Sequence, residues 1–314
     1  MKARLIIILA AMLAISGCSV AGPQSDSAQA AQNAQSETDH SAAASEADSQ
    51  LDSTDNSDNS DNSSKADKVM NEDNKVSVTL NGSSASADTD SSSVKIDGTT
   101  VKLTASGVYT FKGKLDDGVI LVDAPKTDKI EIYLDGVEIN NSSTAPFRVE
   151  ACGGCTVHLT EGSVNSFSDS TSNEFSACIS SKDDLTIKGK GTLNVTGAAK
   201  HAIKSSNDLR IKNGVLVINA ASAGLYGEDS VEISGGNITI EACKDGIKSE
   251  NDNDKTKGIV TIEEAEIDIK GASGNGIEAA VSVTVKSGTV KIHSLKTPVN
   301  CNTQNIAEGT VQKY

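Results

Sequence analysis

A short aliphatic element that recurs at a nearly constant spacing constrains the fold more than any other feature of this chain. Its clearest copies are Ala202-Ile203-Lys204-Ser205, Gly224-Leu225-Tyr226-Gly227, Gly246-Ile247-Lys248-Ser249, Gly276-Ile277-Glu278-Ala279 and Pro298-Val299-Asn300. Their aliphatic residues are 22, 22, 30 and 22 residues apart, and the longer interval contains an eight-residue insertion around 250–257. Such a spacing indicates a repeat architecture, in which each repeat stacks on its neighbours.

Two further strands recur in step with this element, for example Leu209-Arg210-Ile211 and Leu216-Val217-Ile218. Three short strands in each turn of about 22 residues are typical of a parallel β-helix. We therefore predict an all-β domain with a single parallel β-helix of about eight coils over residues 101–301, which would be roughly 35–40 Å long at the usual strand spacing. A β-sandwich is the competing fold, but it would not require a constant coil length.

The first residues have the pattern of an export signal. Lys2 and Arg4 precede an apolar run, Leu5–Ile15, that is too short for a permanent membrane span. The run closes on Ile15-Ser16-Gly17-Cys18, which resembles the lipobox of bacterial lipoproteins. We predict a signal peptide over residues 1–17 and lipidation at Cys18, which would place the protein outside the cytoplasm, anchored by lipid to the cell membrane. The alternative is an ordinary signal peptide that happens to contain a cysteine.

A long polar segment separates this signal from the repeats. Residues 19–75 are mostly Ser, Asp, Ala, Asn and Gln, with 12 acidic and 3 basic side chains. Such a composition cannot bury enough apolar surface to offset its ordering entropy, so we expect a disordered tether over residues 18–75. The rest of the chain, 76–314, has 23 basic and 31 acidic residues. We expect a β cap over 76–100 and the β-helix over 101–314.

Several segments of the repeat region resemble a known bacterial family: Gly107-Val-Tyr-Thr-Phe-Lys-Gly113, Leu134-Asp-Gly-Val-Glu-Ile139, Ser181-Lys-Asp-Asp-Leu-Thr-Ile187 and Asp245-Gly-Ile-Lys-Ser-Glu-Asn251. The family is that of carbohydrate-binding right-handed parallel β-helix proteins. The resemblance implies a non-catalytic, calcium-containing domain with a fold related to pectate lyases. It also implies binding of plant-type polysaccharides, namely cellulose and acidic sugars such as polygalacturonate. Family members repeat an Asp-Gly-Ile element, which this chain keeps only at Asp245-Gly246-Ile247; the corresponding places hold His201-Ala202, Ala223-Gly224 and Asn275-Gly276.

The residue after each recurring aliphatic position should point outward. Coil by coil these residues are Arg148, Ser180, Lys204, Tyr226, Lys248, Glu278 and Asn300. If the register holds, they form one column with a step of about 4.8 Å. We predict a ligand-binding role for Arg148, Lys204, Tyr226, Lys248 and Glu278, because cations pair with the carboxylates of acidic sugars and a tyrosine ring stacks on a pyranose face. The alternative is a solvated sheet face.

Acidic residues gather in the turns between the first and second strands of successive coils. Dense oxygen ligands suit calcium, so we predict metal ligands at Asp183, Asp208, Glu228, Asp229, Asp245, Glu250, Asp252 and Asp254. The alternative is a ladder of Asn and Asp turns whose side chains bond to neighbouring backbone.

The resemblance favours a cell-surface protein that binds polysaccharide without cleaving it, with calcium assistance, and two alternatives stay open. One is a calcium-dependent uronate lyase of the pectate type, which needs an arginine or lysine base beside the substrate. The candidate bases are Arg148, Arg210, Lys200, Lys204 and Lys248, and their spacing does not distinguish among them. The other alternative is a structural or adhesion rod without a defined sugar ligand.

The remaining composition narrows the partners. The chain has no Trp and only four Phe and four Tyr, which argues against a flat aromatic platform for crystalline cellulose. It has no basic stripe, so nucleic acid is excluded, and a monomer is expected. Cys152 and Cys155 are expected to form a local disulfide or to remain free thiols. Small buried thiols are expected at Cys178, Cys243 and Cys301, and surface histidines at His158, His201 and His293.

Overall fold

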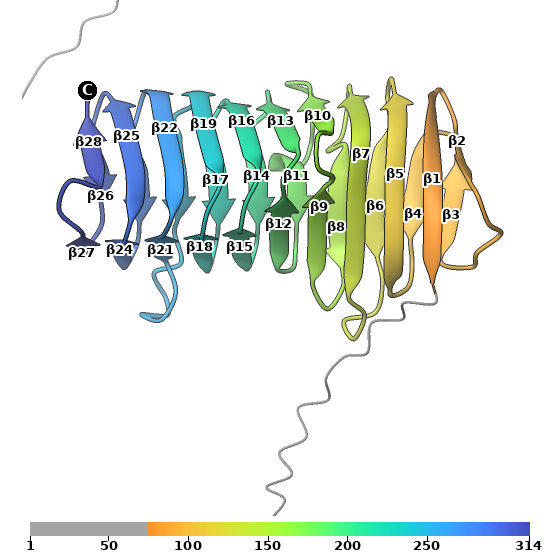
Figure 1. Cartoon of the computed structure of the whole chain (residues 1–314), viewed down its shortest axis with the longest axis horizontal. Helices are drawn as coiled ribbons and strands as arrows, with labels where there is room; N and C mark the ends of the chain where they lie inside the picture. The colour runs from red at the N-terminus through yellow and green to blue at the C-terminus, as the bar shows by residue number, and fades with distance from the viewer. Residues whose placement is uncertain (1–73) are drawn as a thin grey trace, which may run out of the picture. The chain divides into compact units, whose positions relative to one another are not determined.

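The computed structural model describes residues 74–314, and all of their regular secondary structure is β-strand (Figure 1). The predicted signal peptide, the lipidation residue Cys18 and the tether up to residue 73 lie outside the described residues. Residues 74–314 include no helix that could span a membrane.

The strands form two sheets that run along the long axis of the domain. The 10-stranded sheet consists of β3 (Val94–Asp97), β4 (Thr100–Leu103), β6 (Val119–Asp123), β8 (Phe147–Ala151), β11 (Ala177–Ser181), β14 (His201–Ser205), β17 (Ala223–Gly227), β20 (Asp245–Ser249), β23 (Ile277–Ala279) and β26 (Val299–Asn300).

The 18-stranded sheet consists of β1 (Lys75–Gly82), β2 (Ala85–Ala87), β5 (Gly107–Leu115), β7 (Ile130–Asn141), β9 (Cys155–Leu159), β10 (Val164–Asp169), β12 (Leu185–Gly189), β13 (Thr192–Gly197), β15 (Asp208–Ile211), β16 (Val215–Ala220), β18 (Ser230–Ile233), β19 (Asn237–Ala242), β21 (Ile259–Ile262), β22 (Ala265–Ala272), β24 (Ser282–Val285), β25 (Gly288–Ser294), β27 (Thr303–Ile306) and β28 (Val311–Lys313).

These strands wind into the predicted parallel β-helix. One coil is, for example, β14, β15 and β16, and each strand pairs in parallel with its counterpart one coil later, as Ile203 does with Leu225. Residues 74–314 contain nine such coils, from the one that begins with β4 to the one that begins with β26. The prediction of about eight is one too few, because Thr303–Ile306 and Val311–Lys313 lack the aliphatic alternation that marks the other coils.

The prediction of three strands per coil is wrong for the first two coils. In each of these coils one long strand, β5 or β7, takes the place of the two shorter strands that later coils contribute to the 18-stranded sheet (Figure 1). Strand β7 pairs with β9 through Ile130–Leu134 and with β10 near its other end. The division comes at Gly136, where φ is +76°, and the backbone N–H groups of Gly136 and Val137 both donate to the buried Asn165 side chain, at 3.1 and 3.0 Å.

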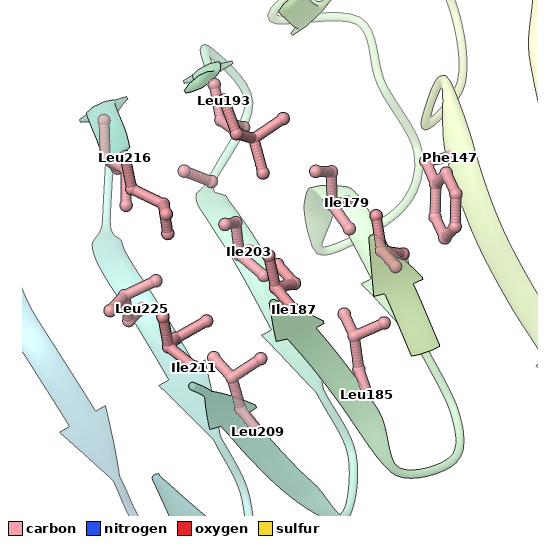
Figure 2. Packing of buried hydrophobic residues seen from close by; sticks show 14 of the residues in the cluster. Phe147, Ile179, Leu185, Ile187, Leu193, Ile203, Leu209, Ile211, Leu216 and Leu225 are labelled. Carbon is pink, nitrogen blue, oxygen red and sulfur yellow. The ribbon is translucent and has the colours of Figure 1, made fainter. Parts of the chain in front are cut away.

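Aliphatic residues stack in rows inside the coils and form one core. Figure 2 shows Leu185 beside Leu209, Ile187 beside Ile211 and Ile179 beside Ile203, and strand pairing gives the same partners. Each of these side chains is at most 3% exposed. Burial of such a side chain contributes about 1.5–3 kcal/mol, so the rows give the 22-residue repeat its energetic basis.

The long repeat interval has a local cause. The turn between β20 and β21 spans residues 250–258, whereas the equivalent turn one coil earlier is Glu228–Asp229. Ile240 pairs with Ile269, 29 residues later, so seven of the eight extra residues lie in this turn. The eighth comes before Ile277, the partner of Ile247. The insertion is thus accommodated outside the strands.

The first strands cover the beginning of the solenoid. Strand β1 adds in parallel to β5, while β2 pairs antiparallel with β1, and β3 pairs antiparallel with β4. Antiparallel strands at this end interrupt the parallel stacking and so protect an edge that would otherwise invite association.

Candidate functional site

The residues predicted as one outward column lie in one register on the 10-stranded sheet. Strand pairing joins Arg148 to Ser180, and then Lys204, Tyr226, Lys248, Glu278 and Asn300, each to the next. The repeat spacing therefore placed these side chains correctly in relation to one another.

Tyr226 does not offer the predicted stacking surface. Its side chain is buried, at 3% exposure, because neighbours cover both its ring and its hydroxyl. The Lys204 ammonium lies 4.8 Å from the ring centroid, and the His201 ring lies 4.7 Å away. The hydroxyl donates to Glu250 Oε1 at 2.6 Å. Burial and this carboxylate raise the pKa of Tyr226 above its ordinary value. Tyr226 therefore organises the column and cannot stack on a sugar in this arrangement.

Carboxylates already neutralise the cations of the column. Lys248 Nζ lies 2.7 Å from Glu250 Oε2 and 3.4 Å from Glu278 Oε1. Lys204 Nζ lies 3.9 Å from Glu228, and the side chains of Lys204 and Lys248 are only 18% and 17% exposed. The column is thus a network of ion pairs, and an acidic sugar would have to compete with protein carboxylates for it.

A protein carboxylate also neutralises Arg148, at the other end of the column. Its Nε lies 3.4 Å from Glu150 Oε1, and the guanidinium carbon lies 4.3 Å from the centre of the Phe175 ring. Lys182 Nζ lies 2.5 Å from the other carboxylate oxygen of Glu150, Oε2. Arg148 is therefore held by an aromatic ring and a carboxylate of the protein itself.

A ladder of buried acceptors occupies the place of the Asp-Gly-Ile element. His201 Nδ1 accepts the Ala223 N–H at 3.1 Å, Asp245 Oδ1 accepts the Asn275 N–H at 2.9 Å, and Asn275 Oδ1 accepts the Thr297 N–H at 3.2 Å. The prediction that His201 lies on the surface is wrong, since it is 4% exposed. The signal that could have indicated this burial is the position of His201 in the family element, because Asp245 at the equivalent position is buried as well.

Burial also sets the protonation state of His201. Desolvation, followed by the charges of Lys200 and Lys204, lowers the pKa of His201 to about 3. The imidazole is therefore neutral near pH 7, as its acceptor role at Nδ1 requires. The other two histidines follow the prediction more closely: His293 is exposed, and His158 is half-buried between Tyr133, at a centroid distance of 4.1 Å, and Glu131.

Basic side chains face the predicted calcium ligands of two acidic turns. Asp208 Oδ2 accepts from Arg210 at 2.5 Å, and Asp229 Oδ2 lies 2.8 Å from Lys257 Nζ. Asn251 donates to the other Asp229 oxygen at 2.7 Å. These carboxylates are therefore compensated by protein cations and amides.

The remaining acidic residues are dispersed. Asp183 pairs with Lys126 and accepts the backbone N–H of Cys152 at 2.9 Å. Asp254 accepts the backbone N–H of Thr256 at 2.9 Å, as in an Asx turn, and Asp252 is exposed. Within residues 74–314 no three His, Cys, Asp or Glu side chains gather as a metal centre would require. The carboxylates thus do not form a complete calcium site by themselves.

The cysteines of the described residues are all free thiols. Of the two possibilities for Cys152 and Cys155, the structure therefore has the reduced one, and both thiols are buried. Burial raises the pKa of Cys152 to about 11, which makes it a poor nucleophile. Cys178 and Cys243 are buried as predicted, whereas Cys301 is partly exposed.

A hollow of about 280 Å³ lies on the face formed by β9, β12 and β15, and Lys129, Glu131 and Arg210 are among its lining residues. Arg210 Nη1 donates to Asp184 Oδ2 at 3.2 Å, and Arg210 Nε lies 3.5 Å from Glu232. Partial burial by itself would lower the pKa of Arg210. The hydrogen bond to Asp184 and the surrounding carboxylates raise this pKa by a larger amount, so it lies above its ordinary value. This guanidinium is therefore a permanent cation.

Three comparisons relate this solenoid to known proteins. The profile of the family described as carbohydrate-binding domain-containing protein matches residues 97–312. A carbohydrate-binding domain-containing protein of Acetivibrio thermocellus is 39% identical over 128 residues, which are 38% of this chain and 45% of that protein. The chain therefore matches less than half of that relative's length.

A solved structure extends the similarity to the fold. It is a polysaccharide lyase-like protein from C. thermocellum, determined as a gadolinium derivative, with 36% identity and a TM-score of 0.73. The match covers 76% of this chain and 100% of that structure. Because the family profile covers almost every coil of the solenoid, the chain belongs to the family of carbohydrate-binding domain-containing proteins.

Proposed function

We propose that the solenoid binds polysaccharide and does not cleave it. The observation that carries the proposal is the match of the carbohydrate-binding family over residues 97–312, which includes every coil except the last residue of the final strand. A stack of parallel coils suits a polymer, because it repeats the same outward positions at intervals of about 4.8 Å along its axis.

The charged groups support binding over a lyase reaction. A general base must lose its proton near the working pH, so its pKa should be near that pH. Arg210 has a raised pKa, and so does Lys248, where the bonds to Glu250 and Glu278 outweigh the effect of partial burial. These two candidate bases are therefore held in their protonated forms.

An acidic glycan bound with the help of calcium is the finer form of this proposal. Residues 76–314 carry eight more acidic than basic side chains, so a polyanion approaching the domain needs a bridging cation. Calcium would take some oxygen ligands from the sugar, which fits acidic turns that lack a complete set of their own. The turn 250–258, with Asn251, Asp252 and Asp254, is the most oxygen-rich of them.

The cell surface is the proposed location. The support is the sequence of residues 1–18, with its charged start, apolar run and terminal Cys18. Replacement of Cys18 by Ser is expected to release the exported protein from the membrane fraction into the medium, as fractionation and immunoblotting would measure. Retention of the Cys18→Ser protein in the membrane fraction would contradict the lipid anchor.

Affinity electrophoresis of the mature chain in gels with polygalacturonate or a neutral β-glucan tests the binding proposal. Retardation in calcium that is lost in chelator supports the calcium-assisted form, whereas equal retardation in both supports binding without calcium. Unsaturated products, detected by ultraviolet absorbance, would make the protein a lyase. An unretarded chain in every gel would overturn the proposed function and leave a structural rod.

A further inference from the structure

We infer that a neutral stretch of polysaccharide lies along the outward surface of β10, β13, β16 and β19, here called the uncharged face, and reaches the hollow beside β22 and β25. The inference rests on the proposed function and adds the surface that carries it. It differs from the predicted column of Lys204, Tyr226 and Lys248, which lies on the 10-stranded sheet.

Charge is sparse on this face. Residues 76–314 contain 23 basic and 31 acidic side chains, yet every outward position of β10, β13 and β16 holds Ser, Thr, Asn or Val. One outward column across the face is Ser166, Asn194, Val217 and Thr239, in direct register. Strand β19 adds outward Asn237, Thr239 and Glu241, and the Glu241 carboxylate is paired with Lys270 at 2.9 Å. A surface without an unpaired charge in so charged a domain complements a neutral, hydroxyl-rich polymer better than a polyanion.

The polar groups of the uncharged face are available to a ligand. In residues 74–314 the side chains of Asn194, Thr239 and Ser166 have no hydrogen-bond partner within the protein. The amide and hydroxyl groups both donate and accept, as sugar hydroxyls do. A glycan would therefore displace only water here. On the charged column it would first have to separate Lys248 from Glu250, at 2.7 Å.

The uncharged face also exposes apolar side chains. Five large apolar side chains are exposed in residues 74–314: Ile96, Val164, Val215, Leu295 and Tyr314. Two of them lie on the uncharged face, Val164 at 61% and Val215 at 41% exposure, and Thr192 lies between them in register. Valine methyl groups beside free hydroxyls match a sugar ring, whose C–H groups and hydroxyls alternate around its edge.

A hollow lies at the end of the face. It has a volume of about 280 Å³, and Thr239, Asp268 and Lys291 line it as the next members of the same column. Asp268 Oδ1 accepts from the Tyr314 hydroxyl at 2.7 Å, and within residues 74–314 Oδ2 has no hydrogen-bond or ion-pair partner. A carboxylate oxygen accepts strong hydrogen bonds from sugar hydroxyls, so this hollow can hold one sugar while the flat face holds the following units.

The test compares matched pairs of surface alanines. Asn194→Ala with Thr239→Ala removes two free groups from the uncharged face. Thr261→Ala with Thr284→Ala removes two outward threonines that pair with each other on β21 and β24, on another face. Isothermal titration of the mature chain with soluble cello-oligosaccharides is expected to show an affinity loss of roughly tenfold to a hundredfold for the first pair and none for the second.

Two further variants keep the result decisive. Asn194→Arg places a bulky charge on the face and should abolish binding, while Lys204→Ala with Lys248→Ala should leave it unchanged. Thermal unfolding curves establish that each variant is folded. If the unaltered chain binds and the Asn194 and Thr239 variants bind equally well, or if only the lysine variants lose affinity, the placement on the uncharged face is wrong. If the unaltered chain binds no glycan of any kind, the proposed function fails as well.

Discussion

At the scale of single residues, one structural task is performed by three different side chains. His201, Asp245 and Asn275 each accept a backbone N–H from the following coil at the same place in the repeat. The task is needed because a buried N–H without an acceptor costs about 1–3 kcal/mol. The aspartate of the family element thus has a structural role in this chain, whatever else it binds.

His201 makes stability depend on pH in a defined direction. Its folded pKa of about 3 lies below the ordinary value of 6.5, so between these values the unfolded chain binds a proton that the folded chain excludes. Stability is therefore lost as the pH falls through this window, by up to about 1.4 kcal/mol per pH unit. We expect His201→Asn, which keeps an acceptor, to lose less stability on acidification, as denaturant unfolding at pH 6.5, 5.5 and 4.5 would measure.

The unaltered chain and the His201→Asn variant share all their other titrating groups. The contribution of those groups to the pH dependence therefore cancels when the two proteins are compared. Asn275 already fills the equivalent position with an amide, so the substitution has a natural precedent within the chain. Parallel loss of stability in both proteins would contradict the assignment of His201 as a buried neutral acceptor.

Asn165 is the second residue whose importance comes from burial. Its side chain is 0% exposed and accepts from the N–H groups of Gly136 and Val137. It also donates to the Thr192 carbonyl at 3.1 Å. We expect Asn165→Ala to lower the free energy of unfolding by about 2–4 kcal/mol, because these buried groups lose their partner. Asn194→Ala on the neighbouring strand is the surface control, and an equal effect of the two would contradict this account.

Alternation made part of this residue-level picture predictable. The repeat spacing predicted the register of the column. In β10, Phe167 must point inward, and strict alternation then also buries Asn165 and exposes Val164. The burial of Tyr226 was not predictable in this way. It depends on Glu250, which reaches the tyrosine hydroxyl from the next coil, and on the His201 ring. Periodicity carries no information about such contacts between side chains.

At the scale of elements, strand positions followed from the sequence better than strand number. The aliphatic rows identify the coils because only inward positions must be apolar. The long β5 and β7 escaped prediction because the glycines inside them, Gly113 and Gly136, do not end the strands although both have positive φ. In β7 the buried Asn165 side chain holds the backbone at this point, and periodicity does not reveal such a contact. The last coil escaped because β27 and β28 are mostly exposed, so they need few apolar residues.

The turn 250–258 should be dispensable for folding. Replacement of Asn251–Gly258 by a single Asp would copy the Glu228–Asp229 turn of the preceding coil. Closing a shorter loop costs less conformational entropy. This gain offsets the loss of the contacts that Asn251 and Lys257 make with Asp229. We expect the free energy of unfolding to change by less than about 1 kcal/mol, measured by denaturant unfolding in chelator.

The same variant examines the calcium proposal. If calcium raises the melting temperature of the unaltered chain through this turn, the shortened chain should show no such increase. An increase of the same size in both proteins would place the calcium elsewhere.

At the scale of the whole molecule, the described domain presents surfaces of different character on one solenoid. The 10-stranded sheet carries ion pairs that are already satisfied, as between Lys248 and Glu278. The uncharged face carries polar groups without protein partners, such as Asn194 and Thr239. Composition alone did not reveal this difference, because the distribution of charge over the faces depends on register.

The central claim is that this solenoid binds polysaccharide without cleaving it. The most direct measurement is isothermal titration of the mature chain with oligosaccharides of defined length, followed by mass spectrometry of the recovered sugar. If the solenoid binds polysaccharide without cleaving it, the titration shows a saturable heat of binding and the oligosaccharides are recovered at unchanged length. Shortened or unsaturated oligosaccharides, or the absence of binding heat with both neutral and acidic sugars, would contradict it.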